Sequence, residues 1–150
     1  MIQTAIYHTM VTWKGEHLGH INMGNGPEMD FSAPPDAKGL PGVLTPEDAF
    51  VAAVNTCIMM MFIWSCERLK LKLLSYGCRA EGTKLIELDQ TESFTYIRLY
   101  PEIRVMANDV APSIIEGRIQ RALKSAQKYS LVANSIKSEV IIKPEIEIIQ

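Results

Sequence analysis

Three cysteines are the residues best suited to chemistry in this chain, and Cys57 has the most unusual setting. It lies within an apolar run, Leu44 to Cys66, that begins like a capped helix. A reactive cysteine needs a cation, a helix N-terminus or a hydrogen-bond donor to stabilise its thiolate. Cys57 falls about three turns into the helix, beyond the reach of the helix dipole, so this help must come from elsewhere in the fold. The alternative is a buried structural thiol, the commoner fate of a free cysteine.

The other two cysteines show no disulfide pattern. Cys66 follows Cys57 by nine residues on the same helix, and about 13 Å of axial rise excludes a bond between them. Cys78 is expected on the core side of a strand, from which it could approach either one. Without a CxxC pair or an even number of cysteines, the sequence indicates reduced thiols.

Glu47, in the first turn of the same helix, is a candidate to share a site with Cys57. Ten residues separate the two by about 15 Å, so they could meet only where the start of one helix reaches the middle of its mate across a two-fold interface. Alone, Glu47 would be an ordinary first-turn carboxylate. His17 and His20 form an HxxH pattern, but no third ligand accompanies them and a hairpin turn does not fix a metal geometry, so no metal is expected.

The first half of the chain predicts a hairpin, a loop and a long helix. Residues 2–12 and "HINMG" flank the turn "KGEHLG", and residues 27–42 contain four prolines and indicate a surface loop. Thr45 as N-cap and Pro46 at the first helical position predict a helix that ends near residues 67–72. Because apolar residues fall on nearly every face of this helix, we expect it to be enclosed on most sides.

The second half begins with strands. Period-two patterns in residues 72–82, 84–89 and 93–106 predict an antiparallel meander, with Pro101 at an edge or bulge.

Pro112 then opens a second helix with a single apolar stripe. The stripe comprises Ile115, Ile119, Ala122, Leu123, Ala126 and Tyr129. A short helix in "SLVANSIKS" and a final strand broken by Pro144 complete the chain. This order of elements predicts an α+β protein.

The composition is that of one globular domain. With 150 residues, 47% hydrophobic and 21% charged, the chain is expected to fold as a single domain over residues 1–150. A net charge of -2 with scattered basic residues argues against nucleic acid or a membrane surface as partner.

The expected location is the cytoplasm. The N-terminus lacks the features of a secretory signal, and the apolar run 49–64 is shorter than a bilayer span and interrupted by Asn55 and Thr56. No cofactor is expected. Since one small sheet and one helix cannot cover the first helix, a homodimer that places the central helices between two sheets is predicted.

Three motifs together resemble the OsmC/Ohr family. "TPEDAFVAAVNTC" is similar to the family's signature of PE, small and apolar residues and then Cys. "TWKGEHLG" is similar to its W-x-G strand, and "AQKYSLVANSIKSEVIIKPEIEI" to its closing helix, turn and strand. The resemblance spans nearly the whole chain. It implies an intertwined α+β homodimer with two central helices packed against antiparallel sheets.

The resemblance also implies a chemistry. Many members reduce organic hydroperoxides with two cysteines. The first, matched by Cys57, attacks the peroxide as a thiolate, and the second captures the sulfenic acid as a disulfide that a dithiol reductant opens. An Arg and the Glu of the PE motif, matched by Glu47, bind and polarise the thiolate near the dimer interface.

Two departures from the family pattern bear on this chemistry. Ser130 stands at the position of the second cysteine, and a hydroxyl cannot close a disulfide. The first 67 residues contain no Arg, which leaves Lys14 and Lys38 as candidate thiolate partners, although an ammonium does not reproduce a bidentate guanidinium. The leading hypothesis is therefore a weak or one-cysteine peroxidase that acts on organic hydroperoxides through Cys57 and depends on an external thiol.

Two alternatives stay open. The protein could be a non-catalytic binder that holds an apolar small molecule at the dimer interface, through the methionine run at residues 59–61, a run that core packing would also explain. Cys57 could also be the nucleophile of a hydrolase or acyl transferase, for which no histidine base can be assigned.

Overall fold

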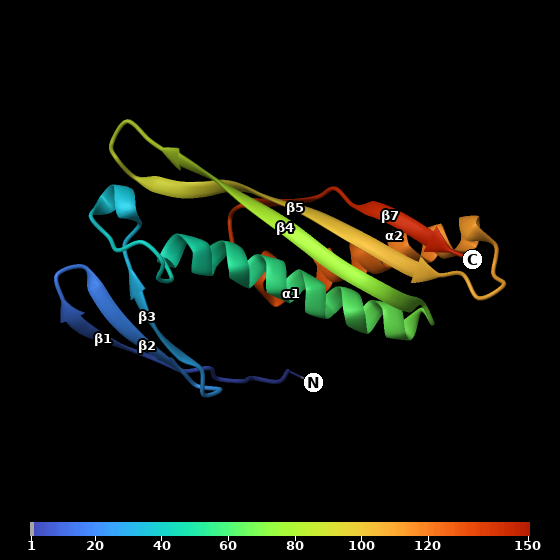
Figure 1. The fold of residues 1–150 in the computed structure, drawn as a ribbon, viewed down its shortest axis with the longest axis horizontal. Helices are drawn as coiled ribbons and strands as arrows, with labels where there is room; N and C mark the ends of the chain where they lie inside the picture. Colours follow the sequence, from blue (N-terminus) through green and yellow to red (C-terminus); the bar gives the residue numbers. More distant parts are fainter. Residues whose placement is uncertain (1) are drawn as a thin grey trace. The chain divides into compact units, whose positions relative to one another are not determined.

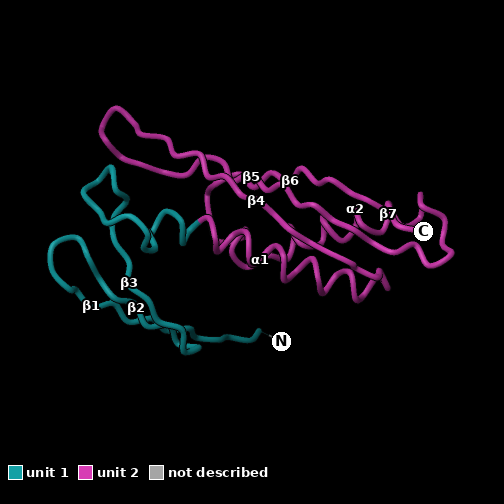
Figure 2. Tube along the Cα trace, viewed as in Figure 1, with its two compact units in different colours: residues 1–50 teal, residues 51–150 magenta. Residues whose placement is uncertain are grey.

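The computed structural model describes residues 2–150, which form two compact units (Figure 2). The first unit comprises residues 1–50 and the second residues 51–150. The division falls inside α1 (Pro46–Arg68), after its fifth residue. The expectation of one domain over the whole chain stays a prediction.

The first unit is built on an antiparallel sheet of β1 (Thr9–Gly15), β2 (Leu18–Met23) and β3 (Glu28–Ser32), in that order (Figure 1). β1 and β2 form the predicted hairpin. The prediction of a loop throughout residues 27–42 is wrong, because β3 pairs with the free edge of β2 and the short helix η1 (Pro35–Ala37) follows it. Whether a segment pairs with the free edge of another strand depends on tertiary contacts, which the local turn-forming residues do not determine.

α1 begins and ends as the sequence predicts. The Asp48 N–H donates to Thr45 Oγ1 at 3.1 Å, which caps the helix. Its buried face consists of Val54, Ile58, Phe62, Ser65 and Cys66. Met60 and Trp64 remain 43% and 57% exposed, so a single chain does not enclose the helix on most sides. By length and composition α1 could also cross a membrane, a test that the core helix of a soluble protein passes equally.

The second unit contains a mixed sheet centred on β5 (Glu92–Met106). β4 (Lys72–Ile86) pairs with β5 in antiparallel fashion, whereas β6 (Glu139–Ile142) and β7 (Glu145–Ile149) pair with successive parts of β5 in parallel (Figure 1). The predicted three-stranded meander is thus a long two-stranded hairpin, because the two segments expected before β5 continue as the single strand β4.

Pro101 lies in this central strand and not at an edge of the sheet. β6 pairs with β5 as far as Leu99, and β7 pairs from Glu102 onward. The Leu99 carbonyl accepts a hydrogen bond from Lys143 N–H, so Pro101, two residues later, turns its nitrogen to the same side. The missing N–H therefore falls in the gap between the two parallel partners, where no ladder bond is lost.

Both long helices cover one face of this sheet. The Phe62 ring of α1 lies 5.4 Å from the Tyr76 ring of β4, and Asn55 Nδ2 donates to Cys78 O at 3.1 Å. From α2 (Pro112–Tyr129), the Gln127 side-chain amide donates to the Val140 carbonyl of β6 at 2.7 Å.

The apolar stripe predicted for α2 is buried along most of its length. Its buried residues are Ile115, Ile119, Ala122, Leu123 and Ala126. Tyr129, predicted as the last member, is 57% exposed. The inward side chains of β5 complete this core, and the α+β class predicted from the order of elements is confirmed. The homodimer stays a prediction.

Candidate functional site

The Ser130 hydroxyl connects the second unit's two long helices through Cys57. Ser130 ends α2 and is the N-cap of α3 (Leu131–Asn134), where its Oγ accepts a hydrogen bond from Ala133 N–H at 3.1 Å. The same Oγ donates its only hydrogen to Cys57 Sγ at 3.1 Å. Ser130 is fully buried, and the Cys57 side chain is half-buried. The structure thus brings together two residues that are 73 positions apart.

This contact gives Cys57 the donor that its place in α1 does not. The hydroxyl donates to the sulfur, and its oxygen is held in position by the hydrogen bond that caps α3. From the sequence alone, Ser130 could be interpreted only as a replacement of the family's second cysteine. A serine between two helices was the available signal, since an N-cap serine uses its oxygen as acceptor and keeps its proton for a neighbour.

Glu47 lies in the first turn of α1 with an unsatisfied oxygen. Its Oε2 is buried and has no hydrogen-bond partner among residues 2–150. Buried carboxylate oxygens are normally hydrogen-bonded, so this atom lacks the partner that its setting requires. Because α1 is unbroken, ten helical residues separate Glu47 from Cys57, about 15 Å of rise, and one helix does not bring them together.

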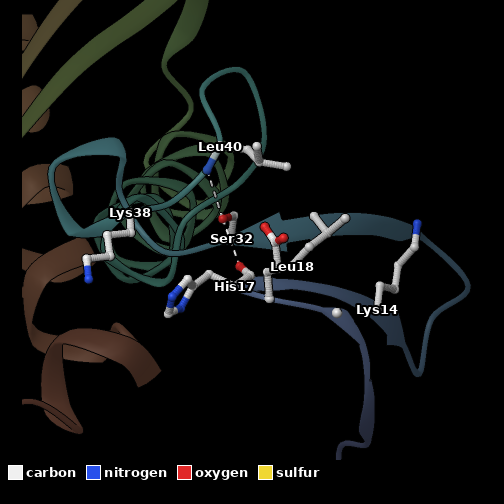
Figure 3. A pocket seen from close by; sticks show the side chains of 8 residues that line it. Lys14, His17, Leu18, Ser32, Lys38 and Leu40 are labelled. Atoms are coloured by element: carbon white, nitrogen blue, oxygen red, sulfur yellow. Dashed lines mark hydrogen bonds between the residues drawn. The ribbon is translucent and has the colours of Figure 1, made fainter.

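Lys14 and Lys38 line the same pocket in the first unit (Figure 3). The pocket encloses about 360 Å³, and Lys14 and Lys38 lie on opposite sides of it. At its base, Ser32 Oγ donates to the His17 carbonyl at 2.8 Å and accepts from Leu40 N–H at 3.0 Å. These bonds tie the loop that carries Lys38 to the sheet that carries Lys14.

The two lysines differ in their availability to a further anion. Lys14 Nζ already bonds both oxygens of Asp30, at 3.0 and 3.1 Å. Lys38 has no carboxylate partner within the part of the chain that the structure describes. It occupies a tight turn with φ of 67°, beside Gly39, where a Cβ would overlap the carbonyl of Ala33. Of the two ammonium groups, that of Lys38 is therefore the more available to an anion.

His20 belongs to an ion-pair cluster rather than to a metal site. Its Nδ1 lies 2.8 Å from Asp30 Oδ1, and its Nε2 lies 3.3 Å from Glu28 Oε1. The hydrogen bond with Asp30 raises the pKa of His20 and lowers the pKa of Asp30. No group of three or more His, Cys, Asp or Glu side chains within residues 2–150 is arranged to hold a metal ion.

All three cysteines are free thiols, and Cys66 and Cys78 differ in setting from Cys57. Cys66 is 2% exposed, and burial, with the nearby charge of Glu67, raises the pKa of its thiol to about 11. Cys78 faces the half-buried side of β4 as predicted, and burial raises its pKa as well. Both thiols are therefore disfavoured as thiolates.

The methionine run does not form a continuous part of the core. Met60 is 43% exposed, and Met59 and Met61 are half-buried. The run therefore offers polarisable side chains at a helix surface, a setting that core packing does not explain for Met60.

The comparisons with known proteins support a single family. A sequence model described as "OsmC-like protein" matches residues 39–145. A search of curated proteins finds no match.

Solved structures share the fold over nearly the full chain. An OsmC-like protein of unknown function from Vibrio cholerae has a TM-score of 0.84 at 21% identity, over 95% of this chain and 100% of that chain. An organic hydroperoxide resistance protein from Elizabethkingia anophelis has a TM-score of 0.72 at 17% identity, over 98% and 99%. OhrB, an organic hydroperoxide resistance protein of Bacillus subtilis, has a TM-score of 0.61 at 14% identity, over 95% and 98%. At these identities the likeness concerns the fold, and with the family match it confirms the resemblance found in the sequence.

Proposed function

Because this chain belongs to the family of OsmC-like proteins, we propose that it is a one-cysteine peroxidase that reduces organic hydroperoxides at Cys57. The observation that carries the proposal is the hydrogen bond from Ser130 Oγ to Cys57 Sγ, which positions the sulfur and gives it a polar partner. Two solved structures with this fold, from Elizabethkingia anophelis and Bacillus subtilis, are named organic hydroperoxide resistance proteins.

The proposed reaction starts with the Cys57 thiolate. Its sulfur attacks one peroxide oxygen, the O–O bond breaks, and the alkoxide takes up a proton and leaves as an alcohol. Cys57 becomes a sulfenic acid. Since Ser130 has no sulfur, an external thiol attacks this sulfenic acid, releases water and forms a mixed disulfide. A second thiol then restores Cys57 and leaves as the oxidised disulfide.

We expect the working form to be a homodimer. The exposed side chains of Met60 and Trp64 lie one turn apart on α1, and such an apolar strip on a central helix needs a cover. A second copy would supply it. In that assembly Glu47 of one copy would meet the Cys57 site of the other, which would give its unpaired oxygen a partner, and Lys38 would supply the cation.

The proposed peroxidase activity can be tested directly. Fully reduced protein is mixed with one equivalent of cumene hydroperoxide, and the sulfenic acid is trapped and located by peptide mass. We expect oxygen addition at Cys57 and peroxide consumption when a small thiol is supplied. Cys57→Ser should abolish both, and Cys78→Ser, which removes a thiol on β4, should retain both. Absence of Cys57-dependent peroxide consumption with every thiol supplied would refute the proposal.

A second candidate is a non-catalytic protein that binds an apolar small molecule. The exposure of Met60 and Trp64 on α1 favours it, since methionine and tryptophan adapt well to apolar ligands. Native mass spectrometry of the freshly purified protein tests it. A retained small molecule, still bound by Cys57→Ser, together with no peroxide consumption, would favour this function over the first.

A further inference from the structure

A groove in the second unit gathers positive charge between α1 and α2. It encloses about 610 Å³, and its charged lining consists of Arg68 of α1 with Arg121, Lys124 and Lys128 of α2. No carboxylate among the described residues lines it. The whole chain has a net charge of -2, and its 15 basic residues look scattered in the sequence. The fold brings four of them to one groove, where their positive potentials add.

Two of these cations have an ordinary explanation in their own helices. Arg68 lies in the last turn of α1 and Lys128 in the last turn of α2. Cations at such positions are stabilised by the unpaired carbonyl groups of the helix C-terminus. Arg121 and Lys124 lie more than one turn from either end of α2, where the helix dipole gives no such stabilisation. Their place in the groove therefore needs another reason.

Neighbouring acids do not balance the charge of the groove. Within residues 2–150, none of its four cations forms an ion pair with a carboxylate. The only acid of α2 is Glu116, which lies more than one turn before Arg121 and outside the groove. Like charges three or four residues apart on a helix repel each other, as Lys124 does with Arg121 and with Lys128. A bound anion would remove this repulsion.

Ser125 joins the two walls of the groove. Arg68 Nη2 donates to Ser125 Oγ at 2.9 Å, which holds the guanidinium against α2. The side-chain bonds of Arg68 within the described chain, to Ser125 and more weakly to Ser65, both use Nη2, so Nε and Nη1 remain available. Since the Ser125 oxygen is the acceptor from Arg68, its own hydrogen is left to donate to a ligand.

The cationic groups surround this hydroxyl. Arg121 precedes Ser125 by four residues and Lys128 follows it by three, so both lie on its side of α2. Lys124 is its direct neighbour in the chain, and Arg68 is bonded to it from α1. The groove thus presents a hydroxyl donor inside a ring of positive charge, an arrangement that suits the oxygens of a multiply charged anion.

Linked phosphate groups match this lining better than a single carboxylate does. Arg68 and Arg121 each carry a guanidinium, which donates two parallel hydrogen bonds to phosphate oxygens. Arg121 and Lys128 are separated by about 10 Å along α2. A chain of two or three phosphates reaches over more of this length than one anionic group, and it brings enough charge to meet four cations.

The groove is separate from the Cys57 site and from the apolar strip of α1. Cys57, Met60 and Trp64 do not line it. Arg68 follows Trp64 by four residues, so the α1 wall of the groove lies one turn beyond the strip. A ligand in the groove is therefore bound independently of the chemistry at Cys57.

We propose that this groove binds a polyphosphate chain, either as the free inorganic ion or as the same group on a nucleotide. The guanidinium groups of Arg68 and Arg121 and the hydroxyl of Ser125 donate to the phosphate oxygens, and the two lysines of the groove add positive charge. The inference goes beyond the peroxidase and does not depend on it.

Tyr129 distinguishes the two sources of the polyphosphate chain. Its ring lines the groove and is 57% exposed. The base of a nucleotide can stack on an exposed aromatic ring, whereas the inorganic ion gains nothing from it. The ring therefore provides a separate test for the nucleotide.

Calorimetric titration of the intact protein with sodium tripolyphosphate tests the site at about 0.15 M salt, where distant charges are screened. We expect one ion to bind per chain, and citrate, which has several carboxylates but no phosphate chain, to bind much more weakly. Lys124→Glu and Arg121→Glu should each weaken tripolyphosphate binding about fivefold, since each turns an attraction into a repulsion. Lys137→Glu makes the same change of charge at an exposed lysine outside the groove and should leave the affinity unchanged.

Ser125→Ala separates a built site from diffuse attraction. It leaves the net charge unchanged and removes the group that holds Arg68. We expect it to weaken tripolyphosphate binding a few-fold. Ser113→Ala, at an exposed serine in the first turn of α2 and outside the groove, is the matched control and should bind as the unmodified protein. Circular dichroism checks that every variant is folded.

A parallel titration with ATP in the absence of divalent metal identifies the source. Tighter binding of ATP than of tripolyphosphate, with the difference lost in Tyr129→Ala, would support the site and assign it to a nucleotide. Equal binding, unchanged in Tyr129→Ala, would support the site and assign it to the inorganic chain. Absence of tripolyphosphate binding, equal binding of citrate, or full affinity in Lys124→Glu, Arg121→Glu or Ser125→Ala would overturn the proposal.

Discussion

Ser130 Oγ lies 3.1 Å from Cys57 Sγ and holds it with a hydrogen bond of defined direction. The oxygen accepts from Ala133 N–H in the cap of α3, so its single hydrogen is directed to the sulfur. A serine here cannot form a disulfide, but its hydroxyl holds the sulfur in position. Under the proposed function, a hydroxyl in place of the second sulfur means that an external thiol must recycle Cys57.

Removal of this hydroxyl should slow Cys57. We expect Ser130→Ala to lower the rate with an organic hydroperoxide by about tenfold or more, because a hydrogen bond to a charged group contributes about 1.5–3 kcal/mol. The loss of the α3 cap should also destabilise the fold by about 1 kcal/mol. Competition kinetics measures the rate, and Ser135→Ala, which removes a hydroxyl bonded to Leu131 O, is the control. Equal rates for Ser130→Ala and the unmodified protein would contradict a role for the donor.

Ser130→Cys should restore a two-cysteine cycle. The Oγ and Sγ atoms are 3.1 Å apart, so two sulfurs at these positions need to approach by only about 1 Å to reach disulfide length. After one equivalent of hydroperoxide, we expect an internal disulfide between Cys57 and the introduced thiol, visible as the loss of two hydrogens in intact mass. If the variant instead accumulates sulfenic acid or an external thiol adduct, the two side chains do not meet as described.

The three thiols should differ in their rates of alkylation. Burial raises the pKa of Cys66 to about 11, so at pH 8 only about one molecule in a thousand carries the Cys66 thiolate. Burial disfavours the thiolate of Cys78 too. We expect iodoacetamide to label Cys57 first and Cys66 last, as followed by peptide mass over time. Labelling of Cys66 before Cys57 in the folded protein would argue against this thiol environment.

The His20–Asp30 pair should make the first unit's stability depend on pH. Because the folded-state pKa of His20 lies above 6.5, its contribution is complete below pH 6.5 and is lost as pH rises through the folded value. Because the pKa of Asp30 lies below 3.8, its contribution is complete above pH 3.8 and is lost as pH falls through the folded value. The pair therefore contributes most between pH 3.8 and 6.5.

An NMR titration of the His20 ring measures this effect. Asp30→Asn should lower the pKa of His20, whereas Asp36→Asn, an exposed carboxylate in η1, should leave the titration unchanged. A His20 midpoint at or below 6.5 in the unmodified protein would show that the pair does not form.

The apolar strip of α1 predicts the oligomeric state. We expect sedimentation at micromolar concentration to give the mass of a dimer, and Met60→Lys with Trp64→Lys to shift it to a monomer, because two charges would then lie in the contact. Leu88→Lys, a change at an exposed leucine in the turn between β4 and β5, should leave the mass unchanged. A monomer in the unmodified protein would refute the dimer.

Local sequence patterns determined much of the fold. The cap at Thr45, the extent of α1 and the buried stripe of α2 are encoded within a few helical turns, so they could be predicted from neighbouring residues. Strand pairing was less predictable. β3 formed where a loop was expected, and Pro101 lies in the central strand, because both depend on which edge of a distant strand is free.

The candidate site, like the fold, could be predicted only in part from the sequence. The sequence by itself identified Cys57 and matched Ser130 to a lost cysteine, since residue type and order carry that information. Only the tertiary structure decided that the Ser130 hydroxyl donates to the Cys57 sulfur and that four scattered cations meet in one groove. A hydrogen bond and a surface charge depend on distances in space, and packing of α2 beside α1 sets those distances over separations of many residues.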